Sequence, residues 1–222
     1  MKQKVHKKYK EYFNKPITHY SEAVNLYQIE ELANQKFSQQ TYTYYTTGAM
    51  NGESYEENEN AFKRYKILPK ILVDVDGVDV STQILGDKIS LPIIIAPTAM
   101  HNLAHFNGEL ETANAANEIG TVICLSTMSS VSKSTIAKVA KHKWKQLYMP
   151  KDLKLAEKTI QSIEKDGYTV LVLTVDAPVM GVRDLENHGK FEGPDKRESK
   201  TKTGTVESGL GQFFKRSFNS VS

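Results

Sequence analysis

The chain has 222 residues, of which 39% are hydrophobic and 25% charged, and its formal net charge is +3. This composition is typical of a folded globular protein with one sizeable core, and it excludes a largely disordered or fibrous chain. No apolar run approaches the length of a membrane span and the N-terminus lacks a signal-peptide core, so we expect a cytoplasmic protein, or a peroxisomal one if a C-terminal signal is missing.

Residues 1–90 read as a helical cap and lead-in to a regular array. Residues 1 to about 20 resemble a frayed arm, and apolar residues at helical spacing over 20–39 predict a helix. An aromatic run, 42–49, includes Tyr44 and ends at Gly48-Ala49, and a charged helix is expected over 56–64. Residues 67–80 read as extended pieces that lead into Ile84-Leu85-Gly86.

The array begins at residues 91–100, an apolar run that stops at a small, proline-containing turn. The run is too short for a membrane span and too continuous for a strand with one wet face, so 92–96 is predicted to be a parallel strand buried on both faces. Residues 107–120 then read as a helix with acidic residues in its first turn and Gly120 at its end.

The same strand, loop and helix pattern recurs three times. Strands are expected over 121–125, 144–149 and 168–176, and helices over 132–141 and from Asp152 to Gly167. Strand starts near 92, 121, 144 and 168 leave room for one helix and two short loops each, which favours parallel strands joined by helices. The single cysteine, Cys124, falls inside the second strand and is expected to be a buried thiol.

Polar side chains follow each predicted strand. Because the carboxyl ends of parallel strands meet at one edge, we expect these groups to converge there. For any single residue, capping of a strand end is the simpler interpretation, and the recurrence after four strands favours a ligand site. The groups are Ala96-Pro97-Thr98-Ala99, Ser126-Thr127, Gln146 with Tyr148, and Thr174 with Asp176, followed by Arg183.

From about residue 27 to about 191 the sequence resembles the FMN-dependent L-2-hydroxy acid oxidases and dehydrogenases, such as glycolate oxidase and lactate oxidase. The resemblance rests on the segments 42–49, 84–86, 95–100, 103–105, 108–109, 125–126, 146–148, 173–178 and 181–183. It implies an α/β fold, a partial (β/α)8 TIM barrel made of the first four βα units, with residues 91–183 as half of an FMN-binding barrel. Residues 184–222 would be a mobile loop and a truncated end.

The resemblance also assigns roles to individual residues. Ala96, Pro97, Thr98 and Ala99 would line the flavin through backbone groups, and Ser126, Gln146 and Thr174 would hydrogen-bond its ring edge. Tyr44 and Arg183 would bind the substrate carboxylate, Tyr148 would place a hydroxyl beside the reacting carbon, and Asp176 would orient a catalytic histidine. The implied partners are a small 2-hydroxy acid and molecular oxygen, with a homo-oligomer or a complementing C-terminal half.

The family's base histidine, its flavin-facing lysine and its phosphate-binding loops belong to a half that this sequence does not show, because no strand–helix unit is apparent after residue 176. We therefore expect the isolated chain to be inactive. Two rival interpretations stay open: a non-catalytic half-barrel that is a degenerate fragment or an interaction module, and an open flavodoxin-like sheet. The latter is disfavoured because no glycine-rich cradle follows the first strand.

Two histidine patterns resemble a zinc motif and a catalytic histidine segment, and neither is expected to have that role. His101 and His105 have the spacing of a zinc helix, but Asn102 replaces the glutamate that the motif needs, so no metal is expected. His188 lies in an Asn-His-Gly segment close after Arg183, where a mobile loop is expected. Basic runs near the N-terminus and at 196–202 are not interleaved with a stacking platform, so no nucleic acid is expected.

Overall fold

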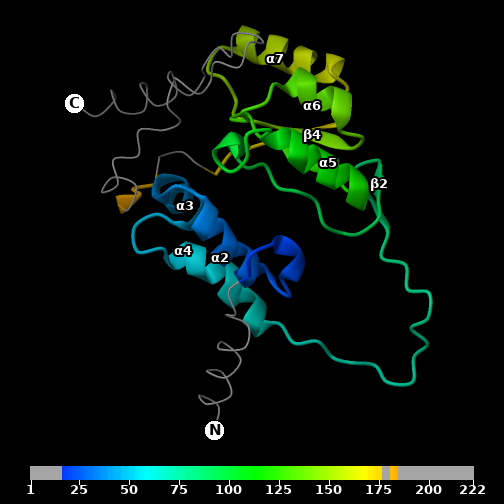
Figure 1. Cartoon of the computed structure of the whole chain (residues 1–222). Coiled ribbons are helices and arrows are strands. Elements are labelled where there is room, and N and C mark those ends of the chain that lie inside the picture. The colour runs from blue at the N-terminus through cyan, green and yellow to red at the C-terminus, as the bar shows by residue number, and fades with distance from the viewer. Residues whose placement is uncertain (1–16, 177–180, 185–222) are drawn as a thin grey trace. The chain divides into compact units, whose positions relative to one another are not determined.

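The computed structural model describes residues 17–176 and 181–184 (Figure 1). They fall into two compact units, one formed by residues 17–66 with 181–184 and the other by residues 67–176. Within these described residues, no helix is both long enough and apolar enough to cross a membrane.

The first unit is helical. It contains a short 3-10 turn (Tyr20–Glu22), α2 (Leu26–Lys36), α3 (Gln39–Thr46), α4 (Glu53–Asn60) and a 3-10 turn (Ala61–Arg64). Asn25 caps α2 by accepting a hydrogen bond from the Gln28 amide, and Ser38 caps α3 through the Thr41 amide. The expected helices over 20–39 and 56–64 are thus confirmed, the second of them beginning at Glu53.

The second unit opens with an extended segment, residues 67–80, and a short hairpin of β1 (Thr82–Ile84) and β2 (Asp87–Ile89). Leu85 and Gly86 form its two-residue turn with φ of 48° and 94°, as a hairpin of this length requires. This hairpin was not predicted from the sequence. A leucine in the left-handed region is uncommon, so Leu85-Gly86 lacks the usual hairpin signal.

Three parallel strands follow, β3 (Ile123–Leu125), β4 (Lys143–Leu147) and β5 (Val170–Leu173), in the order β3-β4-β5. The expected strand over 92–96 is wrong in its extent, because only Ile95 pairs with Ile123, as a parallel bridge. Pro92 has no amide hydrogen, and the Ile93 amide bonds to the Leu91 carbonyl at 2.8 Å. Ile93 is exposed, so this residue is not buried on both faces as expected.

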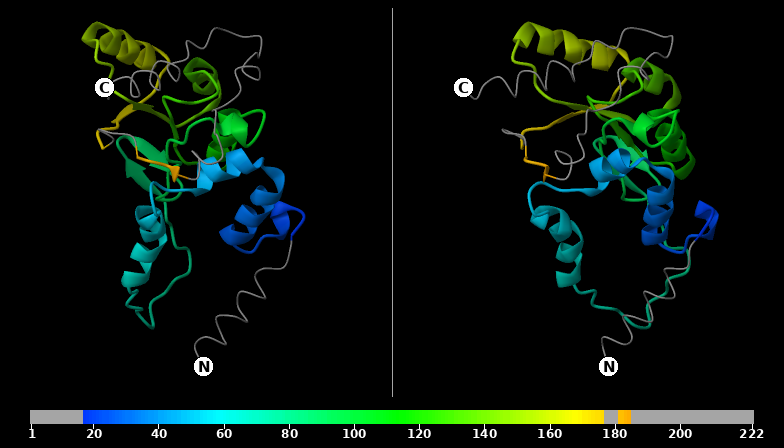
Figure 2. Two further views of the ribbon diagram at one scale, coloured as in Figure 1. Left: turned by 90° about the vertical axis from the view of Figure 1, so that its left-hand side faces the viewer. Right: turned by 60° about the vertical axis from the view of Figure 1, so that its left-hand side comes forward.

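Three helices connect and cover the strands: α5 (Glu109–Ile119), α6 (Lys133–Val139) and α7 (Leu153–Lys165), as Figure 2 shows from two sides. Ser132 caps α6, Asp152 caps α7, and Gly120 ends α5 with φ of 78°. The helix predictions over 107–120, 132–141 and 152–167 are confirmed. A 3-10 turn, His101–Leu103, lies in the loop before α5.

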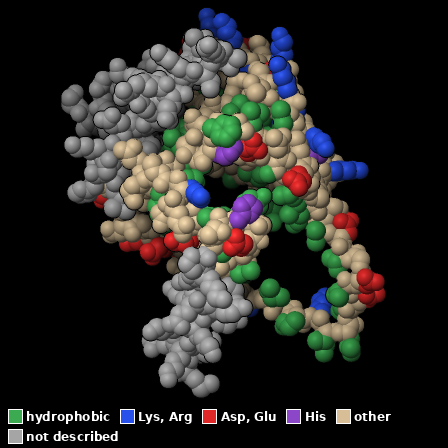
Figure 3. Space-filling view, viewed as in Figure 1, with side chains coloured by type: hydrophobic (Ala, Val, Ile, Leu, Met, Phe, Trp, Pro, Cys, Tyr) green, Lys and Arg blue, Asp and Glu red, His purple; other side chains and the backbone are tan. Residues whose placement is uncertain are grey.

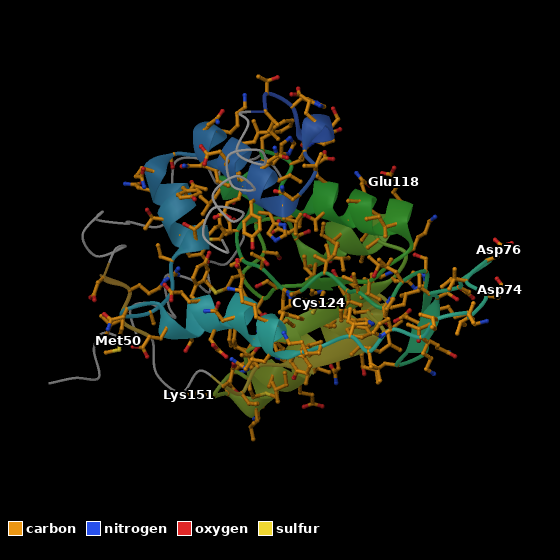
Figure 4. The ribbon with its side chains drawn as sticks, turned by 90° about the horizontal axis from the view of Figure 1, so that it is seen from below. Met50, Asp74, Asp76, Glu118, Cys124 and Lys151 are labelled. Carbon is orange, nitrogen blue, oxygen red and sulfur yellow. The ribbon has the colours of Figure 1, made fainter. Side chains whose placement is uncertain are left out.

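Each face of the sheet has its own buried cluster. On the helix side, Ile123 and Leu125 pack with residues of all three helices, including Ile136 and Ile163. On the other side, Cys124 and Trp144 pack with Val122 and with Ile89 of the hairpin. Cys124 lies in the middle of the strands (Figure 4), and burial raises the pKa of its thiol to about 11, so the expected buried thiol is confirmed.

Asp87 of the hairpin joins the amino-terminal ends of β4 and β5. Its carboxylate accepts hydrogen bonds from His142 Nδ1 at 2.9 Å, Trp144 Nε1 at 2.8 Å and Thr169 Oγ1 at 3.0 Å. Burial alone would raise the pKa of Asp87, but these hydrogen bonds to the charged form lower it overall. The hairpin is thereby fixed to the end of the sheet opposite the predicted site.

Candidate functional site

Gln146, the fourth residue of β4, links the carboxyl ends of the three strands. Its side-chain oxygen accepts a hydrogen bond from the Thr127 amide at 2.8 Å, and its nitrogen donates to Thr174 Oγ1 at 2.8 Å. The Thr127 hydroxyl also donates to the Gln146 carbonyl at 2.7 Å. The sequence prediction that polar groups after these strands converge is therefore confirmed for Thr127, Gln146 and Thr174.

The loop that follows the first predicted strand is tied to the same edge. The Met100 amide donates to the Met128 carbonyl at 3.0 Å, and the Met128 amide donates to Ser126 Oγ at 3.0 Å. Ser126 is buried, whereas Ala96, Pro97 and Thr98 are exposed and Ala99 is half-buried. The four loops that the sequence singled out thus meet at one edge of the second unit.

Glu109, at the start of α5, was missed as a structural organiser of this edge. Its side chain is almost fully buried, and its carboxylate accepts hydrogen bonds from the amides of His101 at 3.2 Å, Ser130 at 2.9 Å and Val131 at 3.0 Å. The Ser130 hydroxyl also donates to it. One carboxylate therefore holds the loops after the first and second predicted strands together.

Lys145, the middle residue of β4, was missed as well, because β4 holds two lysines and a glutamine and its sequence does not mark one lysine as buried. Its ammonium donates to the carbonyls of Leu125 at 3.2 Å and Ser126 at 2.6 Å, at the end of β3. Burial lowers the pKa of Lys145 to about 8. Lys145 thus supports the Ser126 loop from within the protein.

Tyr44 and Arg183, which the sequence paired as carboxylate ligands, are adjacent within the first unit. Arg183 Nη2 donates to the carbonyls of Tyr44 and Thr47, both at 2.7 Å, and Cζ lies 5.3 Å from the centroid of the Tyr44 ring. These carbonyls are at the C-terminal end of α3, where a helix leaves acceptors unsatisfied and favours a cation. The local fold therefore holds the guanidinium over the aromatic ring.

Tyr148 directly follows β4, Asp176 follows β5 after Thr174 and Val175, and both side chains are exposed. His101 Nδ1 lies 2.9 Å from Thr112 Oγ1 of α5, which places this histidine in the support of a helix. Across the part of the chain that the structure describes, no three His, Cys, Asp or Glu side chains are grouped for a metal ion. His188 lies outside the described residues.

Parallel βα units with polar groups at the carboxyl ends of their strands define part of a (β/α)8 barrel, the fold in which enzyme sites occupy this edge. The sequence matches the FMN-dependent dehydrogenase family over residues 33–215, and the chain belongs to this family.

Individual relatives agree with the family match. An L-lactate oxidase from Nostoc sp. is 39% identical over 183 residues, which are 80% of this chain and 50% of that protein. Glycolate oxidase 3 from Arabidopsis thaliana is 38% identical, over 78% of this chain and 47% of its own length. A mandelate oxidase crystal structure matches with a TM-score of 0.75 at 32% identity, over 78% of this chain and 52% of that one. The chain therefore spans about half the length of these relatives.

The groups at the strand ends fit one edge of a flavin ring. Thr174 Oγ1 accepts from Gln146 and Ser126 Oγ accepts from the Met128 amide, so each hydroxyl keeps its hydrogen for an acceptor. Oxygen and nitrogen acceptors line the flavin ring edge, and buried or half-buried hydroxyls suit them. Within the described residues, we find donors suited to the ring rather than a glycine-rich cradle for the phosphate.

Proposed function

We propose that this chain supplies the flavin-edge half of an enzyme that oxidises a small L-2-hydroxy acid, of the lactate or glycolate type, to the 2-oxo acid with formation of hydrogen peroxide. The observation that carries the proposal is the Gln146 link, which fixes the ends of three parallel strands as one polar edge in a member of this family. When bound, FMN would supply the electron acceptor for the oxidation.

The residues at this edge would bind and orient the ring. Ser126, Gln146 and Thr174 would hydrogen-bond its polar edge, and the backbone of residues 96–99 would line it. Because Gln146 and Ser126 are buried and already held by neighbouring strands, they would lose little side-chain entropy on binding.

The residues that would contact the substrate are assigned from the family resemblance. Arg183, held beside Tyr44, would pair with the substrate carboxylate, for which a guanidinium is the strongest side-chain partner. Tyr148 would place its hydroxyl beside the reacting carbon, and Asp176 would orient the histidine that removes the substrate proton. Molecular oxygen would be the second substrate, and a cytoplasmic or peroxisomal location stays a prediction.

The isolated chain should bind FMN weakly and should not oxidise L-lactate or glycolate. Removal of a general base alone typically costs about 10²–10⁴-fold in rate, and no histidine of the described residues lies at the carboxyl ends of β3, β4 or β5. A complementing C-terminal half, in the same or a second polypeptide, would supply the base and the phosphate-binding loops.

The proposal is tested by FMN titration of a chimaera, in which residues 1–184 of this chain are joined to the second half of the Nostoc L-lactate oxidase. We expect Gln146→Leu to weaken FMN binding at least about tenfold. The variant loses the hydrogen bonds from the Gln146 side chain to the Thr127 amide and to Thr174, so Thr174 is no longer held in place. The matched control is Gln161→Leu, an exposed glutamine on α7 that bonds to Glu157 at 3.3 Å. Equal FMN affinity of the two variants would contradict the assigned edge.

A further inference from the structure

Lys145, the middle residue of β4, keeps its ammonium group inside the second unit, where the residue is 6% exposed. Lysine is almost never buried in proteins unless it is paired with an acidic group. Figure 3 shows the ordinary arrangement, with lysine side chains in blue that project into solvent from the outside of this unit. Within the described residues Lys145 takes part in no ion pair, so its burial has another cause.

The partners of the buried ammonium are two consecutive backbone carbonyls. It donates to the Leu125 carbonyl at 3.2 Å and to the Ser126 carbonyl at 2.6 Å. These carbonyls belong to the two peptide groups on either side of the Ser126 Cα atom. Each peptide group is planar, so fixing both of them fixes the two backbone dihedral angles of Ser126 and the direction in which its side chain leaves the backbone.

The Ser126 side chain is then oriented by one further hydrogen bond. Its oxygen accepts from the Met128 amide at 3.0 Å, and Ser126 is itself buried. The hydroxyl keeps its hydrogen for an acceptor outside the loop. Lys145 thus sets the backbone direction and Met128 the side-chain torsion, so the direction of this donor depends on both.

We infer that Lys145 is a positioning residue for flavin binding. It holds the two peptide groups beside Ser126 so that the Ser126 hydroxyl points at the ring edge, and loss of the ammonium proton weakens both this hold and the binding of FMN. The inference rests on the proposed function for the identity of the ligand. It deepens that function, because FMN affinity then depends on a side chain that acts through Ser126.

The proton on Lys145 is lost within an accessible pH range. Burial lowers the pKa of this lysine from 10.5 to about 8. The ionisable groups that act on it are Cys124 of β3, Glu109 at the start of α5 and Lys133 at the start of α6, and its partner on β5 is Leu171. Hydrogen bonds from a charged donor are roughly twice as strong as those from a neutral one. The hold on the two peptide groups therefore weakens as the pH rises through about 8.

This pH dependence separates positioning from a purely structural role. Between about pH 8 and 10.5, loss of the buried charge raises the free energy of unfolding, since the unfolded chain keeps the proton to higher pH. FMN affinity should fall over the same range, because it depends on the charged form of Lys145. A lysine with a structural role alone would not lower FMN affinity while the fold becomes more stable.

The test is FMN titration of the chimaera at pH 7 and pH 9.5 with Lys145→Met, which keeps the length of the side chain and removes its donors. We expect this variant to bind FMN at least about tenfold more weakly than the wild type at pH 7, and within about threefold of it at pH 9.5. The matched control is Lys143→Met on the same strand, whose ammonium donates to the Ala140 carbonyl at 3.2 Å. The control should change FMN affinity by less than about twofold at both pH values.

A second variant, Lys145→Arg, serves if the Lys145→Met chimaera does not fold. Its guanidinium stays charged at both pH values, so it should match the wild type within about threefold at pH 7 and bind FMN at least about threefold more tightly at pH 9.5.

Three results would overturn the inference and leave the proposed function standing, because FMN is bound in each. These are equal FMN affinity of the wild type and Lys145→Met at pH 7, an affinity ratio between them that is the same at both pH values, and a Lys145→Arg variant that follows the wild type at both. A wild-type chimaera that binds no FMN would instead reject the proposed function, and the inference with it.

Discussion

Lys145 carries a positive charge into the interior beside the predicted flavin edge. The nearby ionisable groups are Cys124, Lys133 and Glu109. The pKa of Lys145 is lowered by burial from 10.5 to about 8, whereas the pKa of Cys124 is raised to about 11, so the two groups titrate in separate ranges. Of these two groups, Lys145 is therefore the one whose charge changes first as the pH rises from neutral.

The first prediction concerns pH and stability. Between about pH 8 and 10.5 the folded state holds fewer protons on Lys145 than the unfolded state does, so its contribution to the free energy of unfolding rises with pH. The full rise is about 3 kcal/mol. Urea unfolding at pH 7.5 and 9.5 should show about 2 kcal/mol of this rise in the wild type and not in Lys145→Met, and equal pH slopes for both would refute it.

At neutral pH the same substitution should change stability little. Lys145→Met removes the cost of a buried charge, but it leaves the carbonyls of Leu125 and Ser126 without their donor, at about 1–3 kcal/mol. Since these effects oppose each other and are of similar size, the pH slope is the informative quantity.

Glu109 gives the second prediction. Glu109→Gln places an amide against the donors of His101, Ser130 and Val131, so we expect a loss of about 2–3 kcal/mol in the free energy of unfolding. Glu111→Gln, an exposed neighbour that accepts a bond from Asn107, is the control and should change it by less than about 0.5 kcal/mol. Both are read by urea unfolding at pH 7, and similar losses would show that Glu109 does not hold the two loops.

At the scale of elements, the hairpin depends on one carboxylate. Asp87→Asn weakens three hydrogen bonds to β4 and β5 and should cost about 2 kcal/mol at pH 7. The pKa of Asp87 is lowered in the folded state, so its stabilisation is present above pH 3.8 and is lost as the pH falls through the folded value.

The measurement for Asp87 is thermal unfolding at pH 7 and at acidic pH. The wild type should lose more of its stability on acidification than Asp87→Asn does. Asp79→Asn serves as the control, because the Asp79 carboxylate is fully exposed and bonds only locally to Ser81. A wild type and an Asp87→Asn variant that unfold in parallel at both pH values would contradict this account of the hairpin.

The repeating elements could be predicted because local signals and burial agree in them. Asp152 and Gly167 mark the two ends of α7, and the Val170–Leu173 run is apolar throughout, as a parallel strand must be. The first strand was overestimated because apolar content says nothing about the missing amide of Pro92. The hairpin was missed because Asp87 gains its importance from contacts with residues more than fifty positions away.

Some residues of the candidate site could be predicted from the sequence and others could not. Thr127, Gln146 and Thr174 could be placed together because strand ends of a parallel sheet share an edge. Glu109 and Lys145 could not, because their partners are backbone groups of other loops, and backbone positions leave no trace in the sequence. Tyr44 and Arg183, far apart in sequence, lie side by side in the structure, and the carboxylate-binding role that the resemblance alone gave them stays a prediction.

At the scale of the whole molecule, the described residues hold a site edge and two uncovered apolar surfaces, on β5 and over 67–80. Our proposal explains these features together, because a second half of the barrel would close the strands that carry this polar edge. The chain alone should therefore be less soluble and more prone to associate than the chimaera. Static light scattering of both proteins at matched concentration should show a higher average mass for the isolated chain. A strictly monomeric isolated chain would contradict this prediction.

The central claim is that this half carries the flavin-edge and carboxylate groups of a 2-hydroxy acid oxidase. Its most direct test is peroxide release by the chimaera and by the isolated chain, each incubated with FMN and then with L-lactate or glycolate. The account predicts that the flavin-loaded chimaera releases peroxide with at least one acid and that the isolated chain releases none. The Arg183→Met variant of the chimaera should lose peroxide release. Turnover by the isolated 222-residue chain, or a flavin-loaded chimaera that oxidises neither acid, would contradict it.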